Sequence, residues 1–255
     1  MGSYRVGVQI QPQHTTYASM AEAACRFDRM GVDSIWVWDH FFPLYGNPNG
    51  NHFEAYTLLA ALAALTSHAE LGIMVTCNSY RNPNLLADMI RTIDHISNGR
   101  AILGIGSGWF VRDYKEYGYE YGTAIGRLKA LEAALPVIQE RLNRLNPPPL
   151  RQPLPLLIGG GGEKVTLRLV ARHATLWNII AEPAEAKRKN DLLDNYCKEI
   201  GRDPAGIERT VLLQGNNPLE ELPGYLEAGM THFILGSGDP WNFAGIEKLI
   251  AWRDH

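Results

Sequence analysis

Residues 34–43 read SIWVWDHFFP. The apolar run from Ile35 to Trp38 is typical of a strand that is buried on both faces. Asp39 and His40 follow this run directly. In proteins built from alternating strands and helices, binding sites gather at the carboxyl ends of the strands. The stretch therefore predicts two titratable side chains at a candidate site. The alternative is that Asp39 only caps a turn and that His40 is an ordinary histidine at a strand edge.

Apolar segments of similar length recur on both sides of this strand. They predict strands at residues 4–11, 34–38, 71–76, 101–105, 156–158, 176–180, 210–213 and 232–235. Helical patterns separate them, and eight strand–helix units in 255 residues match a (β/α)₈ TIM barrel. The sequence thus predicts an α/β fold with a single barrel domain over residues 1–255. A doubly wound sheet is the alternative, but it would require a GxGxxG turn after the first strand, and residues 11–13 offer none.

Five local features of the sequence carry narrower predictions. Thr16 or Ser19 opens the first helix, with Ser19 and Glu22 spaced as a capping box. Residues 106–122 form a long loop, the glycines at 159–162 open the fifth helix, and a helix spans residues 219–228. Gly104 is expected to fit the crowded interior of the barrel.

Composition narrows the class of protein. Charged residues make up 20% of the chain and the net charge is −3, which argues against a general binder of nucleic acid or membrane surfaces. We expect no secretion signal and no membrane-spanning segment, since the longest apolar helical stretch, 58–65, is too short. The three cysteines lie far apart with no CxxC pair, so neither a disulfide framework nor a zinc site is expected. A cytoplasmic location is the expectation.

The barrel prediction assigns the catalytic face to residues that follow the strands. These are Gln11, Gln13, Asp39, His40, Thr76, Cys77, Asn78, Arg81, Ser107, Gly108, Trp109, the glycines at 159–162, Asn178, Gln214, Asn216, Ser237 and Asp239. They contain no HxH, HExxH or carboxylate cluster, so we expect no metal. Asp39 and Asp239 are the only obvious carboxylate pair for a glycosidase. Ser107 lies outside a GxSxG elbow, which argues against a serine hydrolase.

Glycines at two strand ends point to a phosphorylated ligand. Residues 106–108 let a ligand approach the backbone, and residues 159–162 present backbone N–H groups that can bind a phosphate. Residues 236–238 form a rival phosphate loop. Aromatic residues are frequent beside these loops, and several at one rim suit a flat apolar ligand. Together these features suggest a flavin-like cofactor.

Several longer segments resemble the luciferase-like monooxygenase superfamily. They are WDHF at 38–41, VTCNSYRNP at 75–83, DHISNGR at 94–100, LGIGSGW at 103–109 and LIGGGG at 157–162. The resemblance runs in order over nearly the whole chain and is closest to the branch that uses the deazaflavin coenzyme F420. It implies a TIM barrel with the cofactor in its carboxyl-terminal mouth. It also implies a non-prolyl cis peptide within residues 73–75.

The resemblance also assigns roles. His40 is the expected catalytic residue, with Asp39 either orienting it or holding the cofactor ring. The expected cofactor contacts are Asp39, Met74, Thr76, Ser107, Gly108, Gly160, Gly161 and Gly162. The expected substrate pocket comprises Phe42, Trp109 and Asn178. Arg112, Lys115 and Lys164 are candidates for pairing with an anionic cofactor tail.

Two departures from the family pattern bear on the substrate. Sugar-phosphate dehydrogenases of the branch carry an acid after the Ser/Thr-Gly pair, whereas Trp109 stands there in this chain. That favours a more apolar substrate. The connection before the fifth strand is also short and lacks a hairpin insertion, which predicts a more open pocket on that side.

The function that follows is an F420-dependent oxidoreductase that moves a hydride between the deazaflavin and a small, rather apolar substrate. One alternative is an FMN-dependent monooxygenase supplied by a separate flavin reductase. Another is a flavin-binding protein without turnover. A homodimer is left open by the sequence.

Overall fold

The computed structural model describes residues 4–214 and 219–254. Within these residues the strands are β1 (Arg5–Ile10), β2 (Ser34–Val37), β3 (Glu70–Ile73), β4 (Thr76–Cys77), β5 (Ala101–Gly106), β6 (Leu156–Gly159), β7 (Leu176–Ile179), β8 (Glu208–Leu213) and β9 (His232–Ser237). All pairings between them are parallel, and the order β3-β2-β1-β9-β8-β7-β6-β5 is closed by pairing of β3 with β5. β4 continues the line of β3 and also pairs with β5, so β3 and β4 together form one interrupted strand. The barrel therefore has eight strand positions. The predicted (β/α)₈ barrel is confirmed.

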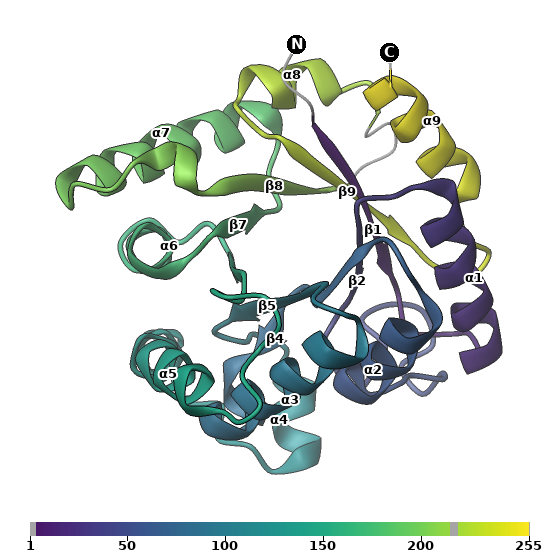
Figure 1. Cartoon of the computed structure of the whole chain (residues 1–255), viewed down its shortest axis with the longest axis horizontal. Helices are drawn as coiled ribbons and strands as arrows, with labels where there is room; N and C mark the ends of the chain where they lie inside the picture. The colour runs from purple at the N-terminus through teal and green to yellow at the C-terminus, as the bar shows by residue number, and fades with distance from the viewer. Residues whose placement is uncertain (1–3, 215–218, 255) are drawn as a thin grey trace.

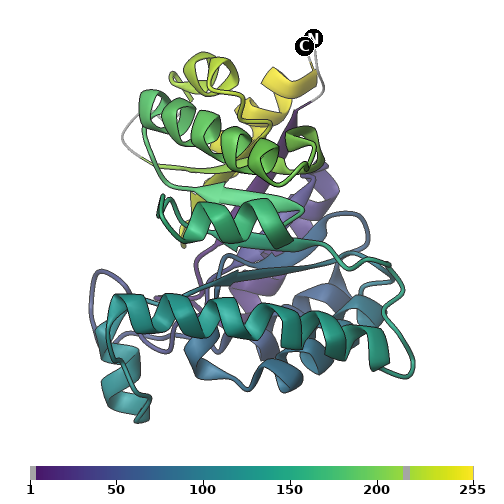
Figure 2. The ribbon, with the colours of Figure 1, turned by 90° about the vertical axis from the view of Figure 1, so that its left-hand side faces the viewer.

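Helices surround the barrel on its outside (Figure 1). In the described ranges they are α1 (Tyr17–Met30), α2 (Ala55–Leu65), α3 (Pro83–Ile96), α4 (Val111–Tyr117), α5 (Ala124–Arg144), α6 (Thr166–His173), α7 (Pro183–Glu199), α8 (Leu222–Glu227) and α9 (Phe243–Asp254), with short 3₁₀ turns at Asn78–Tyr80 and Pro204–Gly206. Figure 2 shows α5, α6 and α7 side by side along one flank. None of the helices in the described part of the chain is both long and apolar enough to cross a membrane.

The strands are buried on both faces, as their apolar composition predicts. Trp36 is fully buried inside the barrel. It packs there with Met74, Ile102, Leu157, Leu176, Leu212 and Ile234. A larger apolar layer separates the outer faces of the strands from the helices. The barrel interior is therefore a packed core rather than a pore.

Four local predictions need correction. The α1 N-cap is Thr16, whose side chain accepts from the Ser19 amide, while the Ser19 hydroxyl donates to Asp239. The predicted Ser19–Glu22 capping box is therefore wrong. The expected loop at 106–122 contains α4. The helix α6 begins at Thr166, after a turn that separates it from the glycines. The helix expected at 219–228 begins only at Leu222.

The third strand of the barrel is interrupted between β3 and β4. The Met74–Val75 peptide bond at this point is cis, within the predicted range 73–75. The side chain of Val75 points toward β5 and β6, because a Cβ added at Gly106 or Gly159 would come within 2.8 Å of its methyl groups. Asn216, predicted at the end of a strand, lies outside the described residues.

Gly104 occupies a position where β5 has no room for a side chain. A Cβ there would lie 2.0 Å from the backbone oxygen of Ile73. The expectation that Gly104 fits a crowded interior is confirmed.

We predict that Gly104→Ala destabilises the fold by about 1–3 kcal/mol, because the added methyl forces neighbouring strands apart. Gly206→Ala is the matched control, since a Cβ at Gly206 meets nothing within 4 Å. Urea unfolding followed by circular dichroism measures both variants. Equal stability of the two variants would contradict the crowding argument.

Candidate functional site

A cavity of about 1060 Å³ opens at the carboxyl ends of the strands. Residues of seven of the eight barrel strands contribute to its lining, and β2 contributes through Trp38 and Asp39, which follow it. The expected catalytic, cofactor and substrate contacts that line it are Asp39, His40, Met74, Thr76, Ser107, Gly108, Trp109, Gly160, Gly161 and Asn178, and the strand-end residues Gln11, Cys77, Gly159 and Gln214 line it as well. Phe42 and Gly162 lie outside this lining. The ring of Phe42 packs instead under the guanidinium of Arg112, at 4.0 Å.

Asp39 is held by a buried ion pair. Its two carboxylate oxygens accept hydrogen bonds from the Arg81 guanidinium at 2.6 and 2.9 Å, and Oδ2 also accepts from the Cys77 amide. Arg81 reaches further to Glu54 at the start of α2 and lies 4.5 Å from the ring centroid of Tyr56. The cavity wall is thereby fixed from three segments of the chain.

Burial and pairing act in opposite directions on these two groups. Complete burial raises the pKa of Asp39 above its ordinary value, and Arg81 with the Cys77 amide opposes that rise. Burial works to lower the pKa of Arg81, but pairing with Asp39 outweighs it and the pKa is raised. Arg81 therefore stays charged beside a carboxyl group that has no water around it.

His40 is held by a carboxylate that the sequence did not suggest. Its Nδ1 lies 2.8 Å from Oδ2 of Asp113, a fully buried residue of α4. The Tyr80 hydroxyl donates to the same oxygen at 2.9 Å, and the Phe41 amide donates to Oδ1 at 3.1 Å. The expectation that Asp39 orients His40 is therefore wrong, because the oxygens of Asp39 are engaged by Arg81 and Cys77.

Glycine residues make up most of the cavity wall at the ends of β5 and β6. Gly108 has a φ of +81°, and a Cβ there would lie 2.2 Å from the Tyr114 hydroxyl and 2.4 Å from Sγ of Cys77. Gly160 and Gly161 line the adjacent part of the cavity. A flat or extended ligand can thus lie directly against the main chain.

The lining carries little charge. No lysine or arginine is among the lining residues within the described part of the chain, and Asp39 is the carboxylate there. Lys189 of α7 lies behind the wall, where its ammonium donates to the carbonyl of Gly161 and approaches Glu163. Arg112 is directed elsewhere, to Pro48 and Asn49.

The rim of the cavity is apolar and exposed. Trp109 is 61% exposed, Ile180 55% and Tyr45 53%, and all three belong to the lining. Trp38 lies beside Tyr45, with 6.1 Å between their ring centroids, and its indole nitrogen donates to Nε2 of His52 at 3.0 Å. This bond requires an unprotonated nitrogen, and burial lowers the pKa of His52 from 6.5 to about 4.

Sequence reasoning missed three contributors to this site. Asp113 was hidden in a stretch that was expected to be a loop. Arg81 was noted at a strand end but without its partner Asp39. Gln9, whose side chain donates to the Met74 carbonyl at 3.1 Å, was taken as part of a strand. Strand alternation could have indicated Gln9, since a polar residue that points into a barrel needs a partner.

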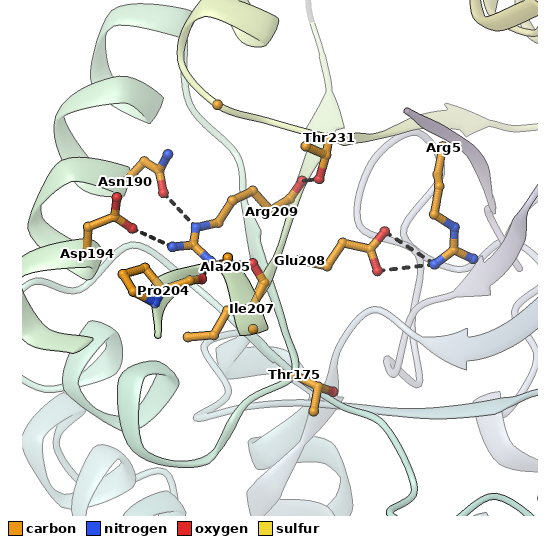
Figure 3. A pocket seen from close by; sticks show the side chains of 12 residues that line it. Arg5, Thr175, Asn190, Asp194, Pro204, Ala205, Ile207, Glu208, Arg209 and Thr231 are labelled. Carbon is orange, nitrogen blue, oxygen red and sulfur yellow. Dashed lines mark hydrogen bonds and ion pairs between the residues drawn. The ribbon is translucent and has the colours of Figure 1, made fainter. Parts of the chain in front are cut away.

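A second cavity of about 750 Å³ lies at the amino ends of β8 and β9 (Figure 3). Its charged side chains are paired with one another. Arg5 binds Glu208, and Arg209 binds Asn190 and Asp194, the contacts drawn as dashed lines in Figure 3. Paired charges at the amino ends of barrel strands contribute to stability rather than to catalysis, so the first cavity is the better candidate. Groups of three or more potential metal ligands are absent among the described residues.

The family model for luciferase-like monooxygenases matches residues 2–214. The chain belongs to the luciferase-like monooxygenase family. Among curated relatives, an F420-dependent glucose-6-phosphate dehydrogenase of Amycolatopsis mediterranei is 31% identical over 137 residues, covering 53% of this chain and 41% of that protein. A phthiodiolone/phenolphthiodiolone dimycocerosates ketoreductase of Mycobacterium tuberculosis is 28% identical, covering 97% of this chain and 75% of that protein. The chain thus spans less than half of the first relative.

Several solved structures share the fold. An F420-dependent secondary alcohol dehydrogenase in complex with an F420–acetone adduct superposes with a TM-score of 0.83 at 19% identity, covering 96% of this chain and 97% of that one. The oxygenating constituent of 3,6-diketocamphane monooxygenase from Pseudomonas putida, in complex with FMN, gives a TM-score of 0.69 at 18% identity. That match covers 84% of this chain and 68% of the other.

The ion pair between Asp39 and Arg81 generates a stability prediction. Arg81→Met should lower the free energy of unfolding by about 3–5 kcal/mol, because it leaves a buried carboxylate without its partner. Arg172→Met, which removes an exposed ion pair with Glu132, should change stability little. Chemical denaturation compares the two. Equal effects would show that burial does not decide the strength of the Asp39–Arg81 pair.

His52 generates a prediction for pH dependence. Because the pKa of His52 is about 4 in the folded chain and 6.5 ordinarily, the unfolded chain binds more protons between these values. Stability from this group is complete above pH 6.5 and is lost as the pH falls towards 4. His52→Gln keeps an acceptor for Trp38 but does not titrate. We expect a flatter dependence of unfolding free energy on pH for this variant, and an unchanged slope would refute the assignment.

Proposed function

We propose that the chain is an oxidoreductase that uses coenzyme F420 to move a hydride between the deazaflavin and a small, neutral and rather apolar alcohol or carbonyl compound. The observation that carries this proposal is the His40–Asp113 pair at the cavity wall, beside glycine backbone and away from lysine and arginine. The alcohol or carbonyl class is supported by the names of two similar proteins, a ketoreductase and a secondary alcohol dehydrogenase.

The cavity fits a deazaflavin or flavin in three respects. Its volume of about 1060 Å³ lies just above the range typical of small-molecule sites, about 300–1,000 Å³, and leaves room for a cofactor together with a small substrate. Gly106, Ser107 and Gly108 belong to the lining, so a ring or ribityl chain can lie against this stretch of backbone. Thr76 and Ser107 supply hydroxyl groups in the same wall. In this proposal Asp39, Met74, Thr76, Ser107 and Gly108 contact the ring and its chain.

The phosphate of the cofactor is assigned to the loop after β6. Gly160 and Gly161 line the cavity there, and Gly162 lies next to them on the side of α6. Lys189 is placed behind this loop and is a better candidate for the anionic tail than Arg112, whose guanidinium is bound to the 44–53 loop.

When bound, the deazaflavin supplies a carbon that accepts or donates a hydride. The chain's own contribution is proton handling and orientation. His40 holds or releases the substrate proton, a role that an imidazole often fills as a general acid or base. Trp109 and Asn178 face the same space and would position the substrate.

The apolar side chains that line the cavity favour an apolar substrate. Trp109 takes the place of the acid found in sugar-phosphate dehydrogenases of the branch, and the rim adds Ile180 and Tyr45. A sugar phosphate would find no lysine or arginine among the described residues of the lining. With the glycine backbone after β6 assigned to the cofactor's phosphate, a second phosphate on the substrate would lose its hydration without compensation.

A monooxygenase that uses FMN from a separate reductase is the second candidate. The family name and the FMN-bound relative from Pseudomonas putida favour it. A flavin-binding protein without turnover is the third candidate. A cytoplasmic location and a homodimer stay predictions.

Titration of the purified protein with F420 and with FMN, followed by fluorescence quenching, separates the cofactors. We expect saturable binding of F420 and weak binding of FMN. Tight FMN binding without F420 binding would overturn the main proposal in favour of the monooxygenase, and binding of neither would remove all three.

His40→Ala should leave the affinity for F420 within about twofold and slow turnover of a secondary alcohol by about 10²–10⁴-fold, the usual contribution of an acid–base residue. Phe42→Ala is the control, since Phe42 lies outside the cavity lining. Unchanged turnover in the His40 variant would show that His40 has another role.

A further inference from the structure

Three hydrogen-bond donors converge on the carboxylate of Asp113. Nδ1 of His40 and the hydroxyl of Tyr80 meet Oδ2, and the amide of Phe41 meets Oδ1. Asp113 is 0% exposed, so water does not compete for these oxygens. An ionised carboxylate can only accept hydrogen bonds, and all three contacts satisfy it in that state.

This arrangement determines which nitrogen of His40 carries the proton. Since Asp113 accepts, Nδ1 must donate, and neutral imidazole then has its lone pair on Nε2. Within the residues that the structure describes, Nδ1 is the ring nitrogen of His40 that has a hydrogen-bond partner. His40 lines the cavity, so Nε2 is the nitrogen left for a ligand.

We propose that Asp113, fixed by Tyr80 and the Phe41 amide, is the positioning residue that locks His40 in the Nδ1–H tautomer and makes Nε2 a base for an alcohol substrate. The proposal rests on the proposed function for its substrate. The hydroxyl proton of the alcohol passes to Nε2, and the hydride on the carbinol carbon passes to oxidised deazaflavin. The products are a carbonyl compound, reduced deazaflavin and an imidazolium whose Nδ1–H still faces Asp113. The reverse sequence reduces a carbonyl compound.

The surroundings of His40 keep this geometry rigid. The rings of Trp109 and Phe110 meet the imidazole edge-on at 5.6 and 5.2 Å. The titratable groups that face His40 are Asp113, Tyr80 and His52, and His52 is neutral above about pH 4. Asp113 is therefore the one anion that bears directly on the imidazole among these groups.

An isosteric substitution turns this argument into a test. In Asp113→Asn one oxygen is replaced by an NH₂ group. If the remaining oxygen of the substituted side chain stays opposite the Phe41 amide, the NH₂ group faces His40 Nδ1 and Tyr80. Nδ1 must then accept, so the proton moves to Nε2 and the base is lost. The reverse orientation would place two donors, NH₂ and the Phe41 amide, against each other and leave both without an acceptor.

The first measurement needs no cofactor. Long-range ¹H–¹⁵N NMR of the apo protein reports the tautomer of each histidine, and the signal absent from His40→Gln identifies His40. We expect the Nδ1–H form in the wild type and the Nε2–H form in Asp113→Asn. A wild-type His40 in the Nε2–H form would overturn the proposal even if the variant does not fold.

Two controls separate positioning from general stability. Tyr80→Phe removes one donor but leaves the carboxylate, so His40 should keep the Nδ1–H form. Asp94→Asn removes another fully buried carboxylate, one that accepts from the Leu150 amide, and should leave the His40 signals unchanged. A tautomer change in Asp94→Asn would show that the readout follows global disturbance.

Kinetics supply the second measurement. Asp113→Asn should lower kcat for alcohol oxidation by about 10²–10⁴-fold with F420 affinity within about twofold, and the acidic limb of the pH profile should shift or vanish. Full activity with an unchanged profile would overturn the proposal. Failure of F420 to bind any variant or the wild type would refute the proposed function instead, while the NMR result on Asp113 would stand.

Discussion

The buried ion pair between Asp39 and Arg81 is the constraint on which the site depends. It joins the end of β2 to the turn after β4, and Glu54 extends it to the start of α2. Two charges in an apolar interior stabilise each other only when their geometry is good and their remaining polar atoms are satisfied. Both conditions hold here, since the guanidinium is bidentate and the Cys77 amide completes the carboxylate. Asp39 thus belongs to the wall, which leaves its neighbour His40 free for chemistry.

A neutral lining follows from this internal pairing. Arg81 and Asp39 cancel each other within the wall, and His40 is matched by Asp113 one layer behind it. The cavity keeps hydroxyl groups, glycine backbone and aromatic faces for its ligands. In a site of low polarity, each remaining polar contact discriminates strongly, because an unpaired group there is costly. Such a site selects ligands by shape and by one or two hydrogen bonds rather than by charge.

The sequence predicts the barrel because its signal is repetitive: apolar strands, helical stripes and short connections agree over the whole chain. It also predicts Asp39 and His40 at the cavity, since a buried strand that ends in polar residues can place them only at its end. It does not reveal Asp113. A residue in an irregular stretch between Gly106 and Gly122 is brought to His40 only by the folding of α4, and no periodicity records that contact. The sequence also predicts that the fifth helix begins at the glycines 159–162, whereas α6 begins at Thr166. The turn between them carries no side-chain pattern that would mark where the helix starts. Contacts between distant elements are decided by packing, which a single sequence does not display.

Closure of the barrel has a consequence for biosynthesis. β1, near the beginning of the chain, pairs in the finished barrel with β9, near its end, through six residue pairs from Arg5–His232 to Ile10–Ser237. During translation at about 5–20 residues per second, the edge of β1 that β9 covers stays unpaired for tens of seconds or less. Its exposed backbone groups and the apolar residues Val6, Val8 and Ile10 are open to pairing with other chains in that interval. The unpaired edge of β1 is therefore open to aggregation until β9 emerges and covers it.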